Sequence, residues 1–203
     1  RFLGQKIQAW VSSGLSLDSI PPELFRLALS YLKILVGGIS PASKQEKAEF
    51  IREYLLCTIV GFIADPEKLV FFYAGDGVFL VNDRIFEIDE GNIPGYPAYH
   101  LVDPDYFSEQ TLKISDSFTQ YSFSMSEVDK FGIASDGFPK DIGDKIWDQE
   151  HPLGLQRKLR VMKLKGEISF PDDCTVITAE KLKPPGGEYE ETSLDGWSKI
   201  QLE

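Results

Sequence analysis

The sequence has few cysteines, few histidines and no long apolar run, and each shortage excludes a class of protein. With two cysteines and two histidines, neither a disulfide framework nor a histidine-rich zinc site is expected. The longest apolar stretches, such as Leu55–Ala64, have strand length, whereas roughly 20 apolar residues are needed to cross a bilayer. Cys57 and Cys174 lie in apolar surroundings. We therefore expect buried free thiols, a reducing cytoplasmic compartment and no membrane partner.

Basic charge is also in short supply. The chain has 21 Lys and Arg residues against 32 Asp and Glu residues, which gives a net charge of −11. A nucleic-acid partner is not expected, because a phosphate backbone needs a basic face. The acidic balance is compatible with a site that gathers carboxylates around cations, although a solvated acidic surface is the commoner explanation.

Apolar residues, in contrast, are plentiful enough for one sizeable core, at 42% of 203 residues. In the first third of the chain they have helical spacing, most clearly over 24–35, where they recur at steps of three and four. Asp18 or Ser19 is expected to cap this helix, and Gly37-Gly38 to end it. Two further helical segments are predicted at 2–11 and 44–54.

At Leu55 the pattern changes to that of strands. Four short segments rich in Val, Ile and Phe are separated by turn residues such as Asp65-Pro66 and Gly75-Asp76-Gly77. The four segments are 55–64, 69–74, 77–81 and 84–88. Their spacing predicts a meander of antiparallel strands.

The rest of the chain mixes all three kinds of structure. It contains a Pro- and aromatic-containing loop at 91–117, strands at 118–125, 130–134 and 174–179, a mostly helical region at 141–165, and a Pro-, Gly- and Glu-rich tail at 183–203. The loop is expected to be a lid, a binding loop or a small satellite core. The order of elements predicts an α+β domain with layered sheets over 1–182, followed by the tail.

Three segments resemble the motifs of one enzyme family. Thr58 lies in a predicted strand that is followed by a strand ending in Gly75-Asp76. Ser135-Asp136-Gly137 ends a later strand, and Asp172-Asp173-Cys174-Thr175 opens the last one. In this order the segments resemble the metal-dependent protein phosphatases of type 2C, in their bacterial form, over residues 55–179. The resemblance implies two antiparallel β-sheets packed as a sandwich and flanked by helices.

The resemblance also implies a site and a reaction. In that family, Mn²⁺ or Mg²⁺ ions lie between the sheets and are held by aspartates at strand ends. Asp136 and Asp172 match the metal ligands, Asp173 matches a supporting position, and Asp76 matches a turn that binds no metal. Two such cations activate a bridging water for hydrolysis of phosphoserine or phosphothreonine in a phosphoprotein substrate. Hard cations of this kind prefer oxygen ligands, and Mn²⁺ and Mg²⁺ remain alternatives.

Each motif also has a plainer interpretation. Asp136-Gly137 between apolar runs is a strong hairpin signal, and Asp172-Asp173 is typical of a solvated turn. His100 and His151 are far apart in the sequence and have no metal-binding spacing. His100 lies in the irregular loop and could be near a substrate, but a packing or surface role is the commoner outcome and is expected here.

Part of the family pattern has no counterpart in the sequence. The family has an early strand with an Asp, an Asp-Gly-x-Gly-Gly-type segment and an Arg that binds the substrate phosphate, and Arg1 does not match the context of that Arg. We expect either a truncated or cleaved phosphatase domain, or a degenerate relative that acts as a pseudophosphatase and binds a protein partner. Truncation is the favoured alternative, because both retained ligand positions are intact.

Overall fold

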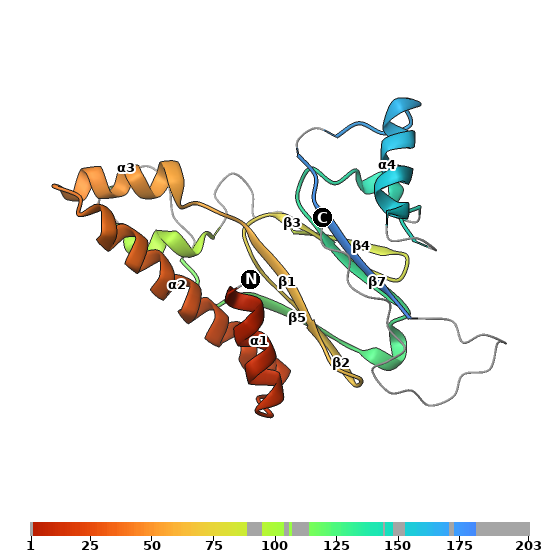
Figure 1. The fold of residues 1–203 in the computed structure, drawn as a ribbon, viewed down its shortest axis with the longest axis horizontal. Helices are drawn as coiled ribbons and strands as arrows, with labels where there is room; N and C mark the ends of the chain where they lie inside the picture. Colours follow the sequence, from red (N-terminus) through yellow and green to blue (C-terminus); the bar gives the residue numbers. More distant parts are fainter. Residues whose placement is uncertain are drawn as a thin grey trace. The chain divides into compact units, whose positions relative to one another are not determined.

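The computed structural model describes most of the chain, namely residues 2–88, 95–103, 106, 114–143, 145–147, 153–170 and 173–181. Figure 1 shows the elements, which in chain order are α1 (Phe2–Ser12), η1 (Leu17–Ser19), α2 (Ile20–Ile39), α3 (Lys44–Tyr54), β1 (Ile59–Ala64), β2 (Lys68–Ala74), β3 (Gly77–Val81), β4 (Arg84–Ile88), η2 (Pro97–Leu101), β5 (Thr119–Ser124), η4 (Met125–Glu127), β6 (Lys130–Ala134), η5 (Lys140–Ile142), α4 (Gly154–Leu164) and β7 (Val176–Glu180). None of the helices within the described ranges has both the length and the apolarity required for a membrane span.

The strands form two antiparallel sheets, with the orders β1-β2-β5 and β4-β3-β6-β7. The predicted α+β class with two antiparallel sheets is therefore confirmed. The chain forms two compact units: residues 1–63, 70–75 and 89–121 make up the first, and residues 64–69, 76–88 and 122–203 the second. The predicted tail at 183–203 lies outside the described residues, so the predicted domain boundary at residue 182 stays a prediction.

In the first unit, α2 packs its predicted apolar face into a core. Leu24 and Phe25 are each 2% exposed, and they cluster with the buried Phe72 of β2. The helix continues through Gly37-Gly38, where its end is predicted, and stops at Ile39. Ser40, with φ 48°, ends the helix in the left-handed conformation.

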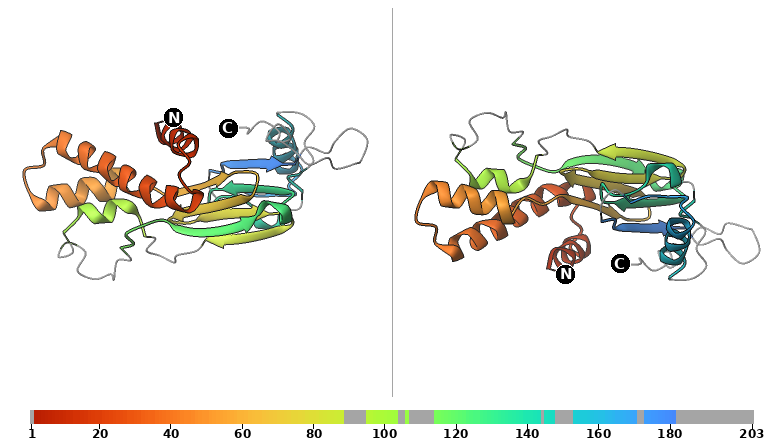
Figure 2. Two further views of the ribbon diagram at one scale, coloured as in Figure 1. Left: turned by 90° about the horizontal axis from the view of Figure 1, so that it is seen from below. Right: turned by 90° about the horizontal axis from the view of Figure 1, so that it is seen from above.

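A second cluster of the first unit joins α2, α3 and η2. Val36 of α2 and Ile51 of α3 pack against Ala98 and Leu101 of η2, and both views of Figure 2 show these three helices side by side. Tyr99 of η2 is also buried. The described part of the predicted loop at 91–117 therefore includes a satellite core.

In the second unit, β3 and β6 are the central strands of the four-stranded sheet. Phe79 pairs with Phe86 on β4 and with Ile133 on β6, and the rings of Phe79 and Phe86 stack with their centroids 4.7 Å apart. On this sheet, Val78 and Leu80 cluster with residues of α4 and of the segment that leads to it. Figure 2 shows α4 beside the strands.

The predicted meander is wrong in one respect, because β2 and β3 follow each other directly but belong to different sheets. Gly75, between them, has φ 97°. A Cβ at Gly75 would lie 2.6 Å from Thr58 Oγ1, so the chain leaves β2 through a conformation and a close approach that only glycine tolerates. The turn redirects the chain to the other sheet and does not close a hairpin.

In the region at 141–165, which is predicted to be mostly helical, the structure has η5 at the start and α4 from Gly154 onward, whereas residues 145–147 are not helical. Before α4, Ile142, Ile146 and Trp147 are buried at 1% exposure or less. A Cβ at Gly143 would lie 2.4 Å from Ile85 Cδ1. Burial against the sheet, and not helical periodicity, therefore determines the path of this segment.

The two cysteines are free thiols, as predicted, but they are less buried than predicted. Cys57 is exposed and Cys174 is half-buried. Cys57 lies two residues before β1, which begins at Ile59, and Cys174 lies two residues before β7, which begins at Val176. Neither cysteine is therefore part of a strand.

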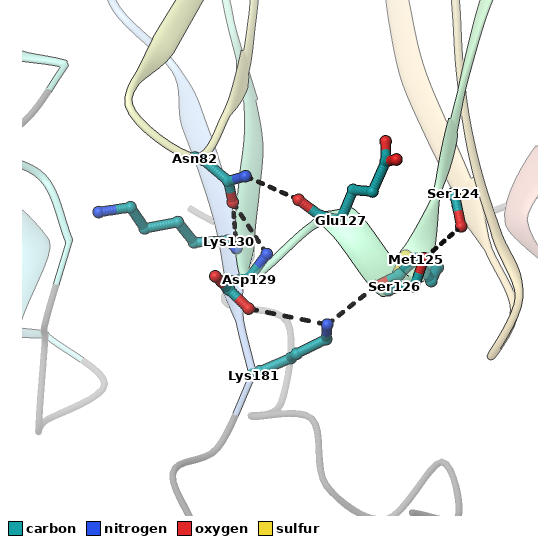
Figure 3. A network of polar contacts seen from close by, with 8 residues as sticks. All are labelled: Asn82, Ser124, Met125, Ser126, Glu127, Asp129, Lys130 and Lys181. Carbon is teal, nitrogen blue, oxygen red and sulfur yellow. Dashed lines mark hydrogen bonds and ion pairs between the residues drawn. The ribbon is translucent and has the colours of Figure 1, made fainter.

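One end of the four-stranded sheet is closed by a polar network around Asn82 (Figure 3). Asn82, with φ 53°, accepts hydrogen bonds through Oδ1 from the amides of Asp129 (2.8 Å) and Lys130 (3.3 Å), and its Nδ2 donates to the carbonyl of Glu127 (2.8 Å). Lys181 Nζ lies 3.8 Å from Asp129 Oδ1. These hydrogen bonds join the turn between β3 and β4 to the segment that leads into β6, which is a structural role.

Candidate functional site

The candidate site lies at the other end of β6, where the strand is followed by Ser135-Asp136-Gly137. The amide of Gly137 donates to Asp136 Oδ1 (3.0 Å), and the amide of Phe138 donates to the carbonyl of Ser135 (3.1 Å). Phe138 is 2% exposed and anchors the turn in the core, whereas Asp136 is exposed. The turn thus presents the Asp136 carboxylate at the end of a central strand.

The segment before β7 lies directly beside this turn. The amide of Ser135 donates to the carbonyl of Thr175 (2.9 Å), and the amide of Thr175 donates to Ser135 Oγ (3.0 Å). Ser135 Oγ in turn donates to the carbonyl of Asp173 (3.2 Å). Two motifs that are about 40 residues apart in the chain are therefore joined by three hydrogen bonds, and β6 pairs with β7 immediately beyond them.

The predicted ligand Asp172 lies outside the described residues, while its neighbour Asp173 is described. Asp136 Oδ1 accepts the amide of Gly137, and within the described ranges the other carboxylate oxygen has no hydrogen-bond partner. Burial raises the pKa of the Cys174 thiol, and the negative charge of Asp136 raises this pKa further. Asp136 is therefore close enough to the Asp173–Thr175 segment to act on it electrostatically.

The donors at this place suit a hard cation. Carboxylate and carbonyl oxygens are the ligands that Mg²⁺ and Mn²⁺ prefer, and the exposed Asp136 offers a carboxylate. In the part of the chain that the structure describes, however, no three His, Cys, Asp or Glu side chains come together as a possible metal site. Asp136 by itself is only part of a metal site, and Asp172 is the second ligand that the sequence predicts.

A groove of about 390 Å³ opens beside the site, between α4 and the beginning of β7. Its walls include Asp173, Cys174 and Thr175 from the site and Leu159 and Lys163 from α4. A ligand in this groove would contact the segment that is hydrogen-bonded to Ser135, with a lysine on the opposite wall.

The remaining candidates have structural roles or lie outside the described residues. His100 Nε2 lies 2.8 Å from the carbonyl of Ser115, and its ring meets Phe25 edge-on, which confirms the predicted packing role. Asp76 lies in the bend between β2 and β3, as predicted for a turn residue. His151 lies outside the described residues.

One feature was missed by the sequence reasoning, namely the basic charge of α4. The residues Arg157, Lys158, Arg160, Lys163 and Lys165 occur within nine positions that contain no Asp or Glu. The signal was present in the sequence as a local run of positive charge in an acidic chain.

Comparisons with protein-family models, with curated proteins and with solved structures gave no match to this chain. The resemblance to type 2C phosphatases therefore rests on the sequence motifs.

Proposed function

We propose that the protein is a metal-dependent phosphatase of the type 2C kind, which hydrolyses phosphoserine and phosphothreonine esters in a cytoplasmic phosphoprotein substrate. The observation that carries the proposal is the junction of the two motifs: Ser135, next to Asp136, is hydrogen-bonded to both Asp173 and Thr175. A plain hairpin turn at Asp136-Gly137 would not require the Asp173–Thr175 segment as a neighbour.

In this proposal, Asp136 and Asp172 would hold the cations. Bound Mn²⁺ or Mg²⁺ would supply an activated water and would offset charge on the phosphoryl group. The amide of Gly137 orients the Asp136 carboxylate through Oδ1. The hydrogen bonds of Ser135 hold the two strand ends in one register.

The test is Mn²⁺-dependent hydrolysis of p-nitrophenyl phosphate and of a phosphothreonine peptide by the full-length natural protein. Asp136→Asn and Asp172→Asn keep the side-chain shape and remove the negative charge. We expect each to lower kcat/KM by at least about 100-fold, since even the outer partners of metal ligands contribute about 10- to 100-fold.

Asp141→Asn is the matched control, because Asp141 is an exposed carboxylate of the same unit and should leave kcat/KM unchanged. Full activity of both site variants would overturn the assignment of these residues. A complete lack of Mn²⁺-dependent hydrolysis by the natural protein would favour the alternative, a pseudophosphatase that binds a protein partner.

A further inference from the structure

Helix α4 carries a concentration of positive charge that is unusual for this chain. Five of the chain's 21 Lys and Arg residues occur between Arg157 and Lys165, in a protein with a net charge of −11. Arg157, Arg160, Lys163 and Lys165 are exposed, and Lys158 is half-buried. The basic charge is therefore presented at the surface.

Most of these charges are not used in ion pairs within the described part of the chain. Lys165 lies 3.7 Å from Glu167, and both side chains are largely exposed, so the pair contributes little. Lys163 lies over the ring of Phe170 at 5.4 Å. For Arg157 and Arg160, no described carboxylate lies within ion-pair distance. Their positive charges therefore form no ion pair that would stabilise the described part of the fold.

Apolar side chains share the outward face of α4 with the arginines. Positions 153, 157, 160 and 164 follow one another at helical spacing. Leu153 is 41% and Leu164 79% exposed, whereas Leu155 and Met162 on the opposite face belong to the core. Arginine is enriched in protein-binding surfaces, and Leu153 and Leu164 add exposed apolar area beside the arginines.

Grooves flank this face on both sides. One, of about 640 Å³, is lined by four basic residues and one acidic residue, Lys145, Arg157, Lys158, Lys165 and Glu167, together with Val161 and Met162. The other is the groove at the candidate site, where Lys163 faces Asp173–Thr175. The basic face of α4 thus extends from an open cationic groove to the strand ends that carry the motifs.

We propose that α4 is a docking surface for an acidic segment of the phosphoprotein substrate, rich in Asp and Glu, near the phosphorylated residue. The proposal rests on the proposed phosphatase function, and charge complementarity defines the occupant. Two grooves with partly apolar walls fit an extended polypeptide, whereas a flat anionic bilayer would contact only the outward ridge of α4. A segment bound across α4 leads into the groove beside Asp173.

The test measures binding separately from catalysis. The probe is a fluorescein-labelled Glu-rich peptide without phosphate, titrated with the full chain by fluorescence anisotropy in the absence of metal. We expect salt-sensitive binding, weakened at least tenfold in the double variant Arg157→Glu/Arg160→Glu. The control Lys6→Glu/Lys33→Glu changes the charge equally at exposed positions of α1 and α2, and should change the affinity less than twofold.

A second arm measures kcat/KM. Arg157→Glu/Arg160→Glu should lower kcat/KM for an acidic phosphopeptide at least tenfold and leave hydrolysis of p-nitrophenyl phosphate unchanged. Arg157→Gln/Arg160→Gln replaces this variant if circular dichroism shows that the Glu version is unfolded. Salt-sensitive peptide binding that depends on α4 supports the docking surface even if neither compound is hydrolysed, an outcome that would count against the phosphatase proposal alone.

Two results would overturn the docking surface. One is equal peptide affinity of the α4 variant and the control variant. The other is co-sedimentation with phosphatidylserine vesicles without binding of the acidic peptide, which would identify α4 as a membrane-contacting helix.

Discussion

Gly75 shows how one residue directs the chain between the two sheets. Its φ of 97° lies in a region that residues with a Cβ avoid, and its backbone lies against Thr58. The sequence predicts a turn at Gly75-Asp76, but the contact with Thr58, 17 positions earlier in the numbering, exists only in the folded chain. Tertiary structure therefore also brings together the two parts of the first family-like motif, namely Thr58 and the Gly75-Asp76 turn.

We predict that Gly75→Ala lowers the free energy of unfolding by roughly 2–4 kcal/mol, as the sum of left-handed strain and overpacking against Thr58. Urea denaturation followed by circular dichroism measures the loss. Gly14→Ala is the control, because Gly14 has φ 79° but no atom within 4 Å of its would-be Cβ. Gly14→Ala should lower the free energy of unfolding by about 1–2 kcal/mol, because it adds the left-handed strain without the overpacking. Equal losses in the two variants would show that the Thr58 contact is unimportant.

At the scale of the elements, local signals and structure agree best where a cap or turn is explicit. Ser43 Oγ accepts the amide of Glu46 (3.1 Å), while Glu46 Oε2 accepts the amide of Ala42 (2.7 Å). This reciprocal arrangement begins α3 at Lys44, where the sequence predicts it. At α2, in contrast, Ser19 stands at the predicted capping position but makes no side-chain capping bond.

We therefore predict different costs for the same substitution at two helix starts. Ser43→Ala should lower the free energy of unfolding by about 1 kcal/mol, because it leaves the amide of Glu46 without its acceptor. Ser19→Ala should change it by about 0.5 kcal/mol or less, as for other surface substitutions. Thermal or urea unfolding of the two variants checks this. A loss at Ser19 as large as that at Ser43 would contradict the assignment of the caps.

At the scale of the whole molecule, the arrangement of strands decides what the candidate site contains. The order β4-β3-β6-β7 places the end of β6 beside the start of β7, and so joins Asp136 to the segment that begins with Asp173. Among the described residues, no third potential ligand completes a metal site there.

We predict that a protein of residues 1–203 alone binds Mn²⁺ weakly, with a Kd of about 10⁻³ M or weaker, the weak limit for carboxylate-lined Ca²⁺ sites. Two carboxylates hold one hydrated cation loosely, and they do not hold a pair of cations at a bridging distance. Isothermal titration calorimetry measures the affinity and the stoichiometry, with Asp136→Asn as the variant that should weaken binding further. Tight binding of two Mn²⁺ ions would show that the ligands have been misassigned.

The sequence by itself determined the type and extent of most elements. The predicted bounds of β3, β4, β6 and α3 coincide with those observed, because alternation, turn residues and caps act over a few neighbouring residues. Asp136 was also accessible to sequence reasoning, since it stands in a recognisable turn.

Tertiary structure alone decided the rest. β2 and β3 are adjacent in sequence but lie in different sheets, and the region before α4 follows the burial of Ile142, Ile146 and Trp147 instead of a helical pattern. The hydrogen bonds of Ser135 to Asp173 and Thr175 likewise depend on the pairing of β6 with β7. Strand pairing and burial are contacts between distant positions, and their free energy depends on the whole packed core, which no local window of the sequence contains.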